Sequence, residues 1–120
     1  MQYLLLLYRD DQWRARLTEE EFAALNREYT ALHDELIASG VYVAAAPLRP
    51  TETATTVRVR DEEMVVTDGP FAETKEQLGG FFLIDVDSVG EARAWAAKVP
   101  AARTGSIEVR PVMPAEVIAG

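Results

Sequence analysis

The hydrophobic residues of the chain gather in short segments whose spacing predicts strands and helices in alternation. Residues 3–8 (YLLLLY) form a continuous apolar run, which is typical of a strand covered on both faces. Residues 81–86 (FFLIDV) predict a second strongly apolar strand, and residues 41–46 predict a shorter one with small side chains. A last strand is predicted at residues 106–112, where Pro111 indicates a position at the edge of the sheet.

Two further segments carry the periodicity and the end signals of helices. Thr18 and Glu21 form a capping box at the start of the first helix, and Gly40 is suited to ending it. The apolar stripe of this helix has members three and four residues apart: Phe22, Leu25, Tyr29, Leu32 and Leu36. A second capping box, made of Ser88 and Glu91, predicts the start of a shorter helix.

Between the two halves of this pattern, residues 53–60 and 64–67 predict a β-hairpin with a polar tip. The order β-α-β, hairpin, β-α-β predicts one α+β domain over residues 1–120, a ferredoxin-like sandwich with both helices on one sheet face. The two strongest strands carry too many apolar residues for one face alone. We therefore expect the other face to pack against a second copy, giving a homodimeric α+β barrel with a ligand cleft between the sheets.

Composition and charge exclude several classes of protein. The chain has no cysteine and one histidine, which excludes disulfide scaffolds, iron–sulfur clusters and multi-histidine zinc sites, so neither a metal nor a cofactor is predicted. Twelve basic and 20 acidic residues give a net charge of −8, which disfavours nucleic acid and anionic membrane surfaces as partners. No apolar run reaches the roughly 20 residues of a membrane span, and no targeting segment is recognised, so a cytoplasmic location is expected.

Residues 68–80 (DGPFAETKEQLGG) are predicted to form a loop whose two ends are held by turn residues. Gly79 and Gly80 would let the chain re-enter the sheet where a side chain would collide. The segment resembles the DGPF signature of the YciI-related proteins, the YCII-related domain family. The resemblance covers nearly the whole chain, including YLLLLYRD, EARAWAAKVP and GSIEVRPV. It implies a dimeric α+β barrel, no established reaction, and an association of some members with extracytoplasmic-function sigma factors.

The candidate site residues come from the first helix, the hairpin and the 68–80 segment. His33 borders the apolar stripe and is a candidate acid or base, with Asp68 as its catalytic partner. Lys75 is the predicted anchor for an anion, and the other binding candidates are Glu73, Phe71 and Arg58. Trp13 is a further candidate for an exposed aromatic contact. Each also has a structural interpretation: a half-buried histidine, a turn-capping aspartate, solvated charges and packed aromatic rings.

Two hypotheses on function follow from these residues and the resemblance. In the first, a small homodimer binds a small organic ligand in the barrel cleft, as a cofactor-free enzyme that uses proton transfer or addition–elimination. In the alternative, which rests on the family association, the protein is a non-catalytic accessory or sensor acting with a sigma-factor system. A third and disfavoured hypothesis is haem-dependent oxidation through His33.

Overall fold

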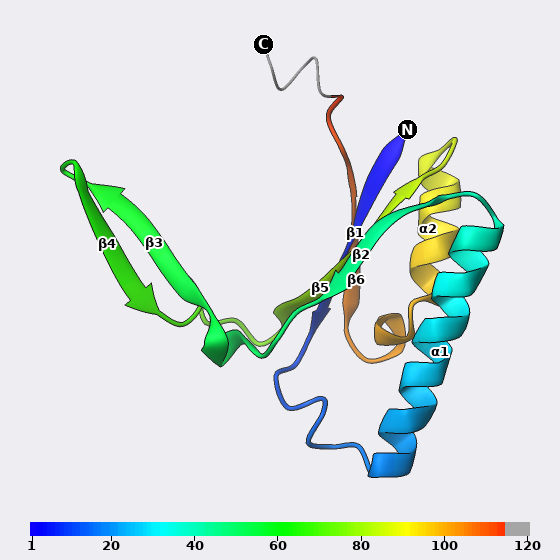
Figure 1. Ribbon diagram of the computed structural model, residues 1–120, viewed down its shortest axis with the longest axis horizontal. Coiled ribbons are helices and arrows are strands. Elements are labelled where there is room, and N and C mark those ends of the chain that lie inside the picture. The colour runs from blue at the N-terminus through cyan, green and yellow to red at the C-terminus, as the bar shows by residue number, and fades with distance from the viewer. Residues whose placement is uncertain (115–120) are drawn as a thin grey trace.

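The computed structural model describes residues 1–114, in which a four-stranded antiparallel sheet carries two α-helices on one face (Figure 1). The strands lie in the order β2-β5-β1-β6 and have these bounds: β1 Gln2–Arg9, β2 Tyr42–Pro47, β5 Gln77–Asp85 and β6 Ser106–Pro111. The predicted α+β class is confirmed, and the arrangement is compatible with a ferredoxin-like sandwich. Strand β6 lies at an edge of the sheet, as Pro111 indicated.

The first helix, α1, spans Glu19–Ala38 and begins at the predicted capping box. The Thr18 hydroxyl accepts a hydrogen bond from the Glu21 amide at 3.1 Å, and the Glu21 carboxylate accepts one from the Thr18 amide at 2.9 Å. The helix ends before Gly40, whose φ of +74° suits glycine. Neither α-helix within residues 1–114 has both the length and the hydropathy that crossing a bilayer requires.

The second helix, α2, spans Val89–Lys98, and its start differs in one detail from the prediction. Ser88 caps the helix by accepting a hydrogen bond from the Glu91 amide at 3.2 Å. The Glu91 carboxylate, however, accepts from the amide of Asp87 at 3.3 Å rather than from that of Ser88, so the capping box is not closed. A short 3₁₀ helix, η2 (Pro100–Arg103), follows directly.

The core lies between the helices and one face of the sheet, because side chains alternate between the two faces along each strand. The buried residues from the central strands and the helices are Tyr3, Leu5, Leu7, Phe82, Ile84, Leu32, Leu36, Ala92 and Ala96. The intervening strand residues face away from the helices and are partly exposed; they include Leu4, Leu6, Phe81 and Leu83. The sheet therefore has one apolar face covered by helices and one apolar face that neither helix covers.

The predicted hairpin is a separate two-stranded sheet that projects from the sandwich (Figure 1). It consists of β3 (Thr55–Arg60) and β4 (Glu63–Asp68), preceded by a 3₁₀ turn, η1 (Thr51–Thr53). Its two-residue tip has positive φ at both positions. One face carries four apolar side chains that are each 53–70% exposed: Val57, Val59, Met64 and Val66. The projection raises the radius of gyration to 16.5 Å, above the roughly 14 Å of a compact domain of this length.

The segment predicted as a loop over residues 68–80 is shorter than expected. Asp68 belongs to β4, and β5 begins at Gln77 because that residue pairs with Arg9 of β1, which local sequence preferences do not reveal. The prediction for Gly80 is confirmed, since a Cβ atom at this position would lie 2.8 Å from the carbonyl oxygen of Ala46.

Candidate ligand-binding site

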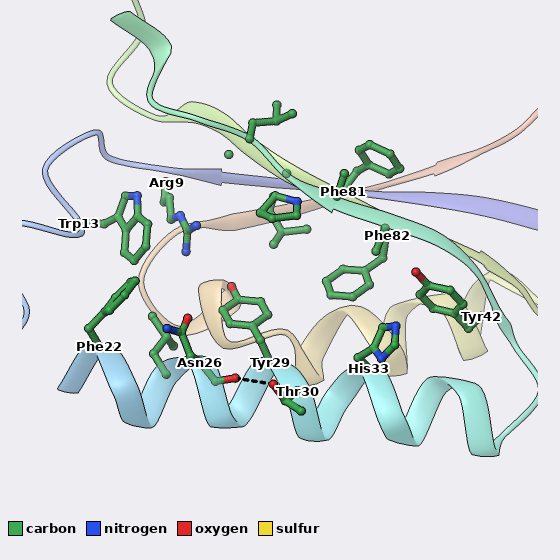
Figure 2. Close-up of a pocket in the computed structure, with 18 residues that line it drawn as sticks. Arg9, Trp13, Phe22, Asn26, Tyr29, Thr30, His33, Tyr42, Phe81 and Phe82 are labelled. Carbon is green, nitrogen blue, oxygen red and sulfur yellow. Dashed lines mark hydrogen bonds between the residues drawn. The ribbon is translucent and has the colours of Figure 1, made fainter. Parts of the chain in front are cut away.

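A cavity of about 580 Å³ lies between α1 and the sheet, on the side of β2 and β5 (Figure 2). Three residues of the predicted helix stripe, Phe22, Leu25 and Tyr29, line this cavity, whereas Leu32 and Leu36 are buried in the core. The apolar stripe thus divides into a packed half and a half that borders a hollow. The volume is within the range of small-molecule sites, about 300–1,000 Å³.

Small residues on the sheet explain why the hollow exists. Ala45 and Pro47 of β2 and Gly80 of β5 line the cavity on its sheet side. In the register, Ala45 pairs with Phe82 and Pro47 pairs with Gly80, so no large side chain fills the space beneath the first turns of α1. Interiors of proteins are close-packed, and a hollow of this size lined by ordered elements is a candidate binding site.

Seven of the 18 residues that line the cavity carry an aromatic ring, and Figure 2 labels them. Trp13, from the segment between β1 and α1, lies with its ring centroid 6.2 Å from that of Phe22. His33 contacts the Tyr42 ring edge-on, with centroids 4.8 Å apart and an interplanar angle of 75°. Such walls suit a flat or apolar ligand, because aromatic rings offer large contact areas and specific stacking geometries.

Arg9 places a positive charge in this apolar surrounding. Its guanidinium carbon lies 3.6 Å from the centroid of the Trp13 ring, a cation–π contact. Its Nε atom is buried and has no hydrogen-bond partner within residues 1–114. A Cβ atom at Gly79 would come within 3.3 Å of this Nε, so the glycine leaves room for the guanidinium. Burial lowers the pKa of Arg9, while the nearby Tyr29 acts in the opposite direction. Arginine stays charged under ordinary conditions.

Tyr29 provides a second polar group on the cavity wall. Its hydroxyl oxygen is buried and, in the part of the chain that is described, no group meets it with full hydrogen-bond geometry, although the Arg9 side chain and the Ala101 backbone lie near enough to act on its pKa. Burial raises the pKa of Tyr29, an effect that the charge of Arg9 opposes. At neutral pH the hydroxyl therefore keeps its proton and can donate it in a hydrogen bond.

Of the residues predicted from the sequence to form a site, Trp13 lines the cavity, and so does His33. Its Nδ1 atom lies 3.7 Å from a carboxylate oxygen of Asp34, which is beyond hydrogen-bond distance. Asp68, its predicted partner, is exposed at the end of β4 and is not part of the cavity wall. The pairing of these two residues in one site of one chain is thus not seen, and their catalytic roles stay predictions.

The predicted binding residues also lie outside the cavity. Arg58 is exposed on β3, and Phe71 is 79% exposed in the segment between β4 and β5. Glu73 is exposed in the same segment. Lys75 is exposed too, and its charge helps to lower the pKa of Asp10, after the Gln12 amide and Arg16.

Sequence reasoning missed Arg9 and Tyr29 as site residues. One signal was present for each: Arg9 directly ends an apolar strand, and Tyr29 is the member of the helix stripe that bears a polar atom. The predicted cleft between two sheets would lie on the other face of the sheet and needs a second copy. It stays a prediction, while the observed cavity is on the face that the helices cover.

Comparison with known proteins assigns the chain to a family. Residues 1–116 match the YCII-related domain, so the chain belongs to this family, as the resemblance predicted. An uncharacterized protein of Rhizobium meliloti (strain 1021) is 41% identical over 114 residues, which cover 93% of this chain and 92% of that protein. The finer assignment to a DGPF branch stays a prediction.

Proposed function

We propose that this protein binds a small organic ligand in the cavity between α1 and the sheet. The observation that carries the proposal is the wall itself: aromatic and aliphatic side chains line a hollow of about 580 Å³, and the few polar groups on it belong to residues such as Arg9, Tyr29 and His33. Small-molecule sites share this composition, in which apolar walls supply contact area and a few polar groups fix the orientation.

His33 is the candidate acid or base for a cofactor-free reaction at this site. Histidine is the side chain best suited to proton transfer near neutral pH, and His33 lines the cavity beside Tyr42. The alternative, a non-catalytic sensor, would use the same cavity and release the ligand unchanged. Chemical analysis of a bound ligand after incubation separates the two, since an enzyme converts it and the His33→Gln variant does not.

Ligand binding can be tested with Trp13 as an internal probe. In a Trp95→Phe background, Trp13 is the remaining tryptophan, and it lines the cavity, whereas Trp95 does not. The probes are four compounds that share one skeleton: 3-phenylpropanoate, 3-phenylpropanamide, 3-phenylpropanol and 3-phenylpropylamine. At least one should change the Trp13 emission and give a saturable heat of binding in calorimetry.

Two variants serve as controls for this titration. Ala45→Leu fills part of the cavity and should abolish binding, whereas Val89→Leu on the exposed start of α2 should leave it unchanged. If no compound binds at millimolar concentration, or if Ala45→Leu binds as well as the unaltered protein, the proposal is wrong.

We also propose that the uncovered sheet face packs against a second copy, which would form the expected homodimeric barrel. The support is the cluster of partly exposed apolar side chains on that face, where Leu6 pairs with Phe81 and Leu4 pairs with Leu83. Large apolar patches of this kind usually mark an interface. Sedimentation velocity at micromolar concentration should show a dimer, which Leu6→Lys converts to a monomer and Val89→Lys does not. A monomeric unaltered protein would contradict it.

A further inference from the structure

We infer that the cavity selects an organic anion, a carboxylate on an aromatic or apolar body, and that Arg9 and Tyr29 bind the carboxylate. This inference rests on the proposed ligand-binding function and adds the chemical class of the ligand. It is carried by three features: the charge of the cavity wall, the missing partner of Arg9, and the orientation of the donors.

Among residues 1–114, no carboxylate lines the cavity. One residue in six of the whole chain is Asp or Glu, yet none of the 18 residues that line the cavity is acidic. Arg9 is the permanently charged residue among them, and His33 can only add positive charge. In a chain with a net charge of −8, a wall of this kind is a local exception that lowers the electrostatic cost of bringing an anion in.

Within residues 1–114, Arg9 is the partly buried arginine without an acidic partner; the arginines that also lack one are exposed: Arg27, Arg49, Arg58, Arg60 and Arg93. Four other arginines of the chain form ion pairs with carboxylates: Arg14, Arg16, Arg103 and Arg110. Arg9 is partly buried, and among residues 1–114 no carboxylate lies within 4.0 Å of its guanidinium nitrogens. A desolvated cation without a counter-ion is unfavourable, and a bound anion would remove that cost.

The donors are held in a fixed arrangement. Stacking on Trp13 at 3.6 Å fixes the guanidinium plane, and Gly79 keeps the space beside Nε free of a side chain. Figure 2 shows Arg9 and Trp13 at one end of the cavity, Tyr29 between, and His33 with Tyr42 at the other end. A guanidinium matches a carboxylate in shape and charge, and a phenol hydroxyl adds one more donor.

This layout orients the ligand. With its carboxylate at the Arg9 end, the body of the ligand would lie along Tyr29 and Phe82 and reach toward His33. His33, the candidate acid or base, would then face a ligand atom that is distant from the ligand's carboxylate. Proton transfer there would not compete with the contacts that Arg9 and Tyr29 make.

The test compares the four phenylpropyl compounds by calorimetry on the full-length protein. We expect 3-phenylpropanoate to bind at least about tenfold more tightly than 3-phenylpropanamide, because hydrogen bonds between charged groups are stronger than neutral ones. Arg9→Met should weaken binding of the carboxylate on the order of 10- to 100-fold and leave that of the amide nearly unchanged. Arg93→Met, which removes an exposed charge from α2, is the matched control and should bind like the unaltered protein.

Tyr29→Phe leaves Arg9 unchanged and provides a second test of the inference if Arg9→Met fails to fold. We expect a loss of about fivefold or more for the carboxylate and none for the alcohol. The inference is wrong if the amide or amine binds as well as the acid, or if both variants bind the acid normally. In both outcomes at least one compound still binds in the cavity, so the proposed ligand-binding function stands. Failure of all four compounds to bind would reject that function as well.

Discussion

The two halves of α1 lie over the same sheet, but the apolar stripe of the helix is packed in one half and borders a hollow in the other. In the C-terminal half, Leu32 and Leu36 are 5% and 1% exposed and belong to the core. In the N-terminal half, Phe22 and Leu25 remain partly exposed on the wall of the cavity. The helix supplies apolar residues throughout, so the size of the side chains on the opposing strands decides which half is filled.

The largest expected difference between the halves concerns stability. Leu36→Ala should lower the free energy of unfolding by about 2–5 kcal/mol, because it leaves a hole in a close-packed core. Leu25→Ala should cost about 1 kcal/mol or less, since this side chain already borders the cavity and is partly exposed. Urea unfolding of both variants measures the contrast. Equal losses would show that the two halves are packed alike.

Filling the hollow should make the N-terminal half resemble the packed half. Ala45→Leu is expected to raise the free energy of unfolding by about 0.5–1 kcal/mol while it abolishes ligand binding. Thermal unfolding and calorimetric titration of the same preparation test both effects. A variant that is less stable and still binds would mean that the added side chain does not occupy the cavity.

The unpaired hydroxyl of Tyr29 should reveal a conflict between stability and binding. In the absence of ligand, Tyr29→Phe is expected to raise the free energy of unfolding by up to about 1 kcal/mol, because a buried polar group without a partner is removed. In the presence of 3-phenylpropanoate, the advantage should shrink or reverse. Unfolding curves with and without this compound check the sign in each state, and a variant destabilised in both would refute the interpretation.

The smallest expected effect is a pH dependence at the start of α1. Hydrogen bonding with Thr18 lowers the pKa of the Glu21 carboxyl, so the ionised form stabilises the folded state. This contribution is present above about pH 5 and is lost as the pH falls through the lowered pKa. Unaltered protein and Glu21→Gln should therefore differ at pH 7 and converge at low pH.

Amide hydrogen exchange locates that effect within the helix. At pH 7, Glu21→Gln should speed exchange in the first turns of α1, which lie over the cavity and depend more on their cap. Residues around Leu32 and Leu36 should exchange as in the unaltered protein, because core packing holds them. Faster exchange along the whole helix would argue against two halves of different stability.

Much of the fold was predictable because its signals are local. The capping box of Thr18 and Glu21, the stop at Gly40, and the edge position marked by Pro111 each depend on neighbours in sequence. The exact start of β5 was not predictable, because Gln77 joins the strand by pairing with Arg9, which is far away in the chain. Ser88 could be predicted as a cap because its partner, the Glu91 amide, is three residues away in the chain.

The site was far less predictable. His33 was recognised from its residue type and its place beside the stripe, and it lines the cavity. Five other predicted residues lie in the hairpin or in the segment after it, outside the cavity wall: Arg58, Asp68, Phe71, Glu73 and Lys75. Of the distinctive 68–80 motif, Gly79 and Gly80 line the cavity. Arg9 and Tyr29 become notable only when their buried polar atoms are seen to lack partners, which is a property of the folded neighbourhood.

The sequence alone determined which segments become helices and strands and which side chains are apolar, because periodicity and caps act over a few residues. Only the tertiary structure decided where those apolar faces meet and where they do not. Ala45 and Gly80 lie far from Phe22 in the chain, and the hollow forms because their small side chains are brought opposite large rings at a fixed distance between helix and sheet.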